Sequence, residues 1–185
     1  MKKFLAIIII FVLVASCKKE TTTQPPVVKP EDFSFPPSSR FAISLITNST
    51  NVNLGSEFDT KIVFYNVQEV FGSAIEIVYD NNLLSIPNQS KLLIGPFFNI
   101  EDTSKILILK KVENLFGRAS LGISYVRNSG LVSNGSGVVF KIKFTPIARG
   151  DTWIKISKCE IRKSDGNFIN NFSNIQIDSL QISIK

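Results

Sequence analysis

The chain has 185 residues, a hydrophobic fraction of 44% and a formal net charge of +6 at pH 7. This size and hydrophobicity exclude a disordered chain and are sufficient for one domain with a substantial core. The 21 lysines and arginines are spread along the sequence without the aromatic-interleaved basic stripe typical of nucleic-acid-binding proteins. We therefore expect no nucleic-acid partner.

The sequence lacks the residues and motifs on which the common classes of enzyme depend. It contains no histidine, which is the commonest general base and the commonest metal ligand. It also lacks a nucleophile elbow, a phosphate-binding glycine loop and a dinucleotide fingerprint. The adjacent Glu101 and Asp102 do not have the separation that glycosidases need. We predict a non-catalytic protein with no catalytic residue, no metal site and no cofactor.

Residues 1–16 have the organisation of a secretory signal peptide. Lys2 and Lys3 precede an apolar run, 4–15, which is shorter than the roughly 20 residues that span a bilayer as a helix. The following Val14-Ala15-Ser16-Cys17 resembles the bacterial lipobox. The resemblance implies cleavage before Cys17 and lipidation of that cysteine. An ordinary signal peptide and an uncleaved anchor are the alternatives.

Lipidation would anchor the chain stably, because a diacylglycerol and an N-acyl chain together supply more than one lipid signal. In bacterial lipoproteins, a residue such as Lys18 after the cysteine implies release from the inner membrane. The expected location is therefore the bacterial cell envelope, with a lipid anchor in the outer membrane and the domain periplasmic or surface-exposed.

Residues 17–40 are expected to form the lipidated cysteine and a semi-rigid tether. This stretch holds five of the eight prolines and almost no periodic apolar pattern. The predicted domain then covers 41–185. With Cys17 lipidated, Cys159 has no partner for an intrachain disulfide, and its place among isoleucines indicates a buried, unreactive thiol.

From residue 41 onward the apolar residues recur with a period of two, which predicts strands. Phe58, Ile62 and Phe64 are expected inward, with Asp59 and Lys61 outward. The expected strands lie at 41–47, 58–67, 73–79, 105–112, 118–126, 138–144, 153–161 and 175–184. Turn signals are present at 54–56, 80–82, 134–137, 149–151 and 165–167. We predict an all-β sandwich of about nine strands.

Three strands have irregular patterns. The run 105–112 is apolar on both faces, so we expect a central or covered strand. In 153–161 the alternation slips between Ile156 and Cys159, and in 175–184 it slips between Ile177 and Leu180. Such slips are typical of β-bulges.

Four motifs in one order resemble the cohesin family. They are a Gly-Ser strand start at 55–56, a strand ending in Tyr79-Asp80 and followed by Leu83 and Leu84, a Gly-x-Gly-led alternating strand from 135, and an Asp-Gly-Asn turn at 165–167. The resemblance covers about 41–185. It implies a nine-stranded β-sandwich with jelly-roll topology, and a protein that binds dockerins, which are small calcium-loaded modules of secreted proteins.

The resemblance also implies a binding face to which the strand 73–79 contributes. If Ile75, Ile77 and Tyr79 point into the core, Gly72, Ala74, Glu76 and Val78 point outward. Cohesins often have dockerin-contacting polar residues early on this strand, where this chain has Gly72 and Ala74. The candidate partner-binding residues are Glu76, Val78, Ser124 and Arg127.

Three functions remain open at this point. The first is a membrane-anchored module that docks dockerin-bearing or other secreted proteins at the cell surface. The second is a carbohydrate-binding or adhesive module that takes part in polysaccharide binding or breakdown, for which Trp153 and Tyr65 are candidate stacking residues. The third is a structural lipoprotein of the envelope.

Overall fold

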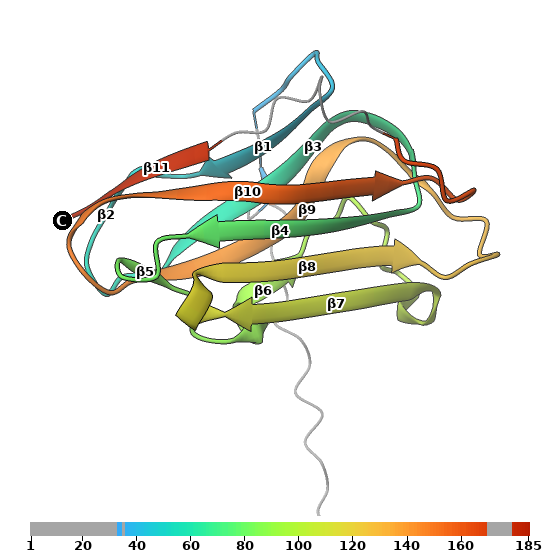
Figure 1. The fold of residues 1–185 in the computed structure, drawn as a ribbon. Helices are drawn as coiled ribbons and strands as arrows, with labels where there is room; N and C mark the ends of the chain where they lie inside the picture. Colours follow the sequence, from blue (N-terminus) through green and yellow to red (C-terminus); the bar gives the residue numbers. More distant parts are fainter. Residues whose placement is uncertain (1–32, 35, 170–178) are drawn as a thin grey trace, which may run out of the picture.

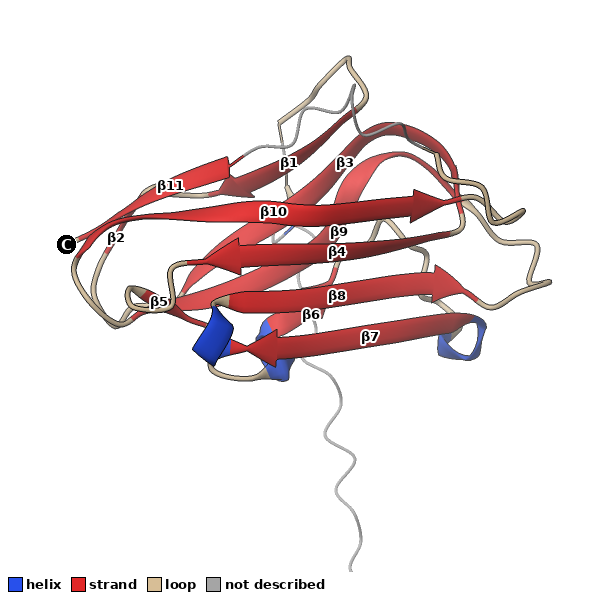
Figure 2. Ribbon diagram, viewed as in Figure 1, coloured by secondary structure: helices blue, strands red, loops and turns tan. Residues whose placement is uncertain are grey.

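The computed structural model describes residues 33–34, 36–169 and 179–185, and it arranges their strands in two packed layers (Figure 1). The predicted signal peptide, Cys17 and the predicted bulge beside Ile177 lie outside the described residues. Among the described residues, no helix is long and apolar enough to cross a membrane. The only helices in this part are short 3-10 turns, blue in Figure 2.

The first layer, here called the back sheet, has five strands. Its order is β1-β3-β9-β5, with β6 also paired to β9. All of these pairs are antiparallel. The strands are β1 (Ala42–Thr47), β3 (Phe58–Val70), β9 (Ser133–Pro146), β5 (Leu84–Ser85) and β6 (Leu92–Ile94).

The second layer, here called the front sheet, has six strands in the order β2-β11-β10-β4-β8-β7 and lies in front in Figure 1. Only the short pair β11–β2 is parallel. The strands are β2 (Asn51–Val52), β11 (Ser179–Ile184), β10 (Gly150–Arg162), β4 (Gly72–Tyr79), β8 (Arg118–Tyr125) and β7 (Ile106–Glu113).

The predicted fold class is confirmed. The described residues form an all-β jelly-roll sandwich of eleven strands, of which β2 and β5 have only two residues each. The predicted bulge on β10 is also confirmed, because the β10–β4 register shifts between Ile156 and Lys158. The expected turn at 134–137 is wrong. These residues belong to β9, whose pairing with β3 continues through Val67↔Gly135 and Val70↔Ser133 with register shifts.

The core lies between the two sheets and is rich in aromatic rings. Tyr79 of β4 meets Phe144 of β9 edge to face, with ring centroids 5.2 Å apart. Phe98, on the loop after β6, is fully buried and packs against Tyr125 of β8 at 5.5 Å. The inward positions predicted for Ile75, Ile77 and Tyr79 are confirmed, since all three are at most 3% exposed.

The Tyr79-Asp80 end of β4 is held by hydrogen bonds. The Tyr79 hydroxyl donates to Asn114 Oδ1 at 2.6 Å, and burial raises the pKa of Tyr79 to about 12. The same Asn114 side chain accepts from Ile86 N at 3.0 Å and donates to Ile86 O at 2.8 Å. Asp80 Oδ1 accepts from Asn82 N at 2.9 Å, as expected for a residue that caps a turn. Asn114, on the β7–β8 connection, is therefore hydrogen-bonded both to the end of β4 and to Ile86, the residue after β5.

The outer face of the back sheet is not free. Lys61 and Lys141 are each only 2% exposed, and Tyr65 is 3% exposed. The segment before β1 lies on this face, where Phe33 packs against the cluster of Val63, Tyr65 and Val138. The expectation that Lys61 and Tyr65 face solvent is therefore wrong, because strand alternation cannot show that another part of the chain covers the outer face.

Polar contacts accompany this covering. Lys61 Nζ donates to Ser34 O at 3.2 Å, and Lys141 Nζ lies 2.9 Å from Asp59 Oδ2. Asn66 Nδ2 donates to Ser38 O at 2.9 Å and to Arg40 O at 3.0 Å. Part of the segment predicted as a tether is thus bonded to the back sheet.

We predict that Asn114→Ala destabilises the domain by about 2–3 kcal/mol, because it removes three hydrogen bonds and leaves the Tyr79 hydroxyl without its acceptor. The measurement is the free energy of unfolding from urea titration. The control is Asn81→Ala, which removes a single exposed bond to Leu115 O and should cost about 0.5 kcal/mol or less. Equal costs for the two variants would contradict the assigned role of Asn114.

Candidate binding face of the front sheet

The outer face of β10-β4-β8-β7 presents side chains in four cross-strand rows. The registers of the three strand pairs align one outward residue from each strand. In the order β10, β4, β8, β7, the rows are Arg162-Gly72-Ser124-Leu107, then Glu160-Ala74-Gly122-Leu109, then Lys158-Glu76-Ser120-Lys111, then Lys155-Val78-Arg118-Glu113. The first two rows make one half of the face and the last two make the other.

The first half of the face is an apolar groove of about 520 Å³. Its floor consists of small residues, among them Gly72, Ala74 and Gly122, and Leu107 and Leu109 stand along one side. These two leucines are 63% and 61% exposed. The groove exists because β4 and β8 have almost no side chains where β7 has large ones.

The prediction that the strand 105–112 is central or covered is wrong. Among the described residues, β7 is the edge strand of the front sheet and its leucines face solvent. The pattern indicated apolar residues on both faces correctly, since Ile106 is buried on the inner face. It could not show whether the outer face has a cover within the chain.

The second half of the face is charged. Glu76 Oε1 accepts from Ser157 Oγ at 2.7 Å, and Arg118 Nε lies 3.5 Å from Glu76 Oε2. Lys111 Nζ lies 2.9 Å from Glu113 Oε1. The two rows contain Lys158, Lys111, Lys155 and Arg118 against Glu76 and Glu113, so positive charge is in excess there.

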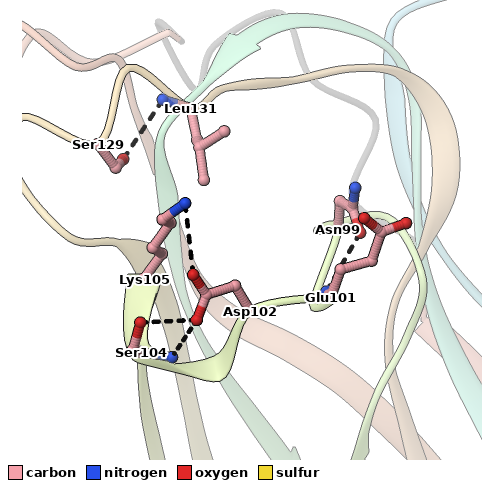
Figure 3. A network of polar contacts seen from close by, with 7 residues as sticks. All are labelled: Asn99, Glu101, Asp102, Ser104, Lys105, Ser129 and Leu131. Carbon is pink, nitrogen blue, oxygen red and sulfur yellow. Dashed lines mark hydrogen bonds and ion pairs between the residues drawn. The ribbon is translucent and has the colours of Figure 1, made fainter.

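The loop leading into β7 is held by its own polar contacts, shown in Figure 3. The Asp102 carboxylate accepts from Ser104 Oγ at 2.6 Å and from Ser104 N at 3.1 Å, and it pairs with Lys105 Nζ at 3.3 Å. The Ser104 hydroxyl, followed by the Ser104 backbone N–H and Lys105, lowers the pKa of Asp102. Asp102 caps the turn at Thr103–Lys105 and so fixes where β7 begins.

Three of the four partner-binding residues predicted from the sequence lie on this sheet, but not all on one patch. Ser124 lines the apolar groove, whereas Glu76 and Val78 lie in the charged rows. Arg127 lies in the turn after β8 and belongs to none of the four rows. Sequence reasoning missed Leu107 and Leu109. The available signal was the double-faced apolar pattern, which was read as burial within the chain.

Other candidate residues of the sequence have structural positions. Cys159 is 1% exposed on the inner face of β10, as predicted, and burial raises the pKa of its thiol to about 12. Asp165 Oδ1 accepts from Asn167 N at 2.8 Å within the predicted turn. No group of three or more His, Cys, Asp or Glu side chains suited to a metal ion occurs among the described residues.

We predict opposite effects of alanine at the two glycines of the groove floor. A Cβ on Gly72 would lie 2.7 Å from Ser124 Cβ, so Gly72→Ala should lower the stability by about 1–2 kcal/mol. A Cβ on Gly122 would meet Leu109 Cβ at an ordinary 3.5 Å, so Gly122→Ala should be neutral or slightly stabilising. Thermal unfolding of the two variants tests this, and a destabilised Gly122→Ala would contradict the geometry of the groove floor.

The comparisons with known proteins agree with this architecture. Neither the protein-family models nor the sequences of curated proteins match the chain. Three similar solved structures are a type II cohesin–X–dockerin complex and a cohesin–dockerin complex with a type I interaction, both from Acetivibrio cellulolyticus, and a non-cellulosomal cohesin from Archaeoglobus fulgidus.

The type II complex has a TM-score of 0.66 at 13% identity over 79% of this chain and 100% of the matched chain. The type I complex has a TM-score of 0.62 at 17% identity over 77% of this chain and 98% of the matched chain. The archaeal cohesin has a TM-score of 0.58 at 21% identity over 78% of this chain and 91% of the matched chain. The four motifs of the sequence and the two sheets of the structure thus lead to the same result: the described domain has the cohesin fold.

Proposed function

We propose that this domain is a non-catalytic binding module that docks dockerin-type modules of other proteins through the outer face of β10-β4-β8-β7. The observation that carries the proposal is the exposure of Leu107 and Leu109 beside a floor of small residues. A groove of this composition is suited to the apolar side chains of a partner. Two of the similar structures are cohesins in complexes with dockerins, which supports this class of partner.

The apolar half of the face supplies the binding energy in this proposal. Covering the exposed parts of the two leucines contributes about 2–4 kcal/mol to binding. The upper value corresponds to a gain of more than about a hundredfold in affinity. Gly72 and Ala74 offer no side-chain hydrogen bond at the positions where cohesins often have polar contacts. Shape and apolar burial therefore replace hydrogen bonding in this half of the face.

The charged half selects the partner. With Lys158, Lys111, Lys155 and Arg118 against Glu76 and Glu113, this half attracts an acidic surface. We therefore propose a partner with apolar side chains at one end of its contact surface and carboxylates at the other. Association should slow as the salt concentration rises, since the rim charges act mainly on the rate of encounter.

The location completes the proposal. The lipobox-like Val14-Ala15-Ser16-Cys17 supports a lipid anchor at Cys17, with the domain held at the bacterial cell envelope, in the outer membrane. A module anchored in this way would retain secreted proteins at the cell. Radiolabelled palmitate incorporated by the chain, and lost in Cys17→Ser, would test the anchor separately from the binding face.

The test of partner class is a pull-down from the secreted proteins of the source organism. The chain is immobilised, and binding is compared in calcium and in chelator, followed by mass spectrometry. Calcium-dependent recovery of proteins that share a duplicated Asp/Asn-rich loop module is the expected result. Recovery that is unaffected by chelator, or that lacks such modules, would overturn the dockerin assignment.

We predict that Leu107→Asp combined with Leu109→Asp reduces partner binding at least about a hundredfold, because two charges would have to be buried in the groove. Leu115→Asp is the matched control, since Leu115 is 87% exposed on the β7–β8 connection and lies outside the four rows. Isothermal calorimetry with a recovered partner measures both affinities. Equal affinities of the two variants would contradict the assignment of the groove.

A further inference from the structure

A second depression, of about 460 Å³, lies on the outer face of the front sheet at β10 and β11. Its lining shares no residue with the apolar groove. The lining residues are Thr50, Asp151, Thr152, Trp153, Gln181, Ile182 and Ser183. Trp153 is the single tryptophan of the chain.

The strand registers bring aromatic and polar side chains together in this depression. Trp153 lies opposite Gln181, and Asp151 lies opposite Ser183. Trp153 and Asp151 point outward, because Thr152 and Ile154, which alternate with them, are buried. The depression is thus a small surface with an indole at one end, and an amide, a carboxylate and a hydroxyl around it.

These groups are available to a ligand. Trp153 is 38% exposed and lines the depression. Lys155 Nζ lies over one face of its ring, 4.5 Å from the centroid. Among the described residues, the side chains of Asp151, Gln181 and Ser183 have no hydrogen-bond partner. Lys155 is exposed and long enough to move aside or to donate to a ligand hydroxyl.

We propose that the Trp153 depression binds a neutral saccharide. One face of a pyranose ring presents C–H groups, which pack on an aromatic ring, while its hydroxyls lie around the edge and need donors and acceptors. Trp153 supplies the aromatic ring. The side chains of Asp151, Gln181 and Ser183 supply the hydrogen-bond donors and acceptors. The negative Asp151 and the positive Lys155 offset one another, so neither an acidic nor a basic sugar is favoured.

This site goes beyond the proposed function and does not depend on it. The two depressions have different linings, and Leu107 and Leu109 are absent from the second one. Lys155, which lies over the Trp153 ring, also belongs to the charged rows of the docking face. A module with both sites would hold a protein partner and a polysaccharide on one sheet. Failure of dockerin binding would leave the saccharide site intact, and the reverse also holds.

The single tryptophan makes the test direct. The full chain, purified in a detergent without a sugar headgroup, is titrated with cellohexaose, xylohexaose, mannohexaose and chitohexaose while the Trp153 emission is recorded. A saturable shift or quench with at least one of the four, with a Kd of about 1 mM or tighter, is the expected result. No change with any of the four up to about 10 mM would overturn the proposal.

Variants then locate the site by affinity electrophoresis in gels that contain the matching polysaccharide. Trp153→Ala should lower the affinity about tenfold or more, and Gln181→Ala about three- to tenfold. Leu109→Asp, in the other depression, should leave saccharide binding unchanged. Gln181→Ala is a surface change that should not unfold the chain, so full affinity in that variant, or a loss in Leu109→Asp, would overturn the proposed position.

Discussion

The position of β4 between β10 and β8 is the constraint on which both the core and the binding face depend. Its period of two directs Ile75, Ile77 and Tyr79 into the sandwich. The hydrogen bond from the Tyr79 hydroxyl to Asn114 then ties the end of β4 to the connection between β7 and β8. With the inner residues fixed in this way, Gly72 and Ala74 must face outward between β10 and β8. One register thus decides what is buried and what is offered to a partner.

The two outer faces of the sandwich differ in how far other parts of the chain cover them. Part of the outer face of the back sheet is covered by the segment before β1, with Phe33 on the apolar cluster, and the buried Lys141 pairs with Asp59. The outer face of the front sheet is exposed on β7, where Leu107 and Leu109 face solvent. Because the chain enters across the back sheet, the groove lies on the side of the domain opposite to that entry. This arrangement suits a module whose front face meets other molecules.

Alternation alone was sufficient to predict the parts of the structure in which one face is core and the other is solvent. It gave the inward residues of β4, the bulge on β10 and the sandwich itself. It failed for the exposure of outward side chains where the outer face of the strand is not simply a solvated surface. Lys61 and Tyr65 have the outward parity of exposed residues but lie under a segment with no periodic pattern. Leu107 and Leu109 belong to a run that is apolar on both faces, which is typical of a covered strand, yet they are exposed at the edge of the front sheet.

The packing of the candidate face also explains why the outward positions at the start of β4, Gly72 and Ala74, have no polar side chain. At Gly72 a side chain would collide with Ser124, so the backbone of β8 and the close pairing there require glycine. At Gly122 there is room for a methyl group, yet any larger side chain would fill the space beside Leu109. The groove is therefore maintained by the absence of side chains on two adjacent strands and by their presence on the third. In the proposed function, recognition on such a surface would select first for the shape and apolar character of the partner, and the charged rows beyond Glu76 would then select among the partners that fit.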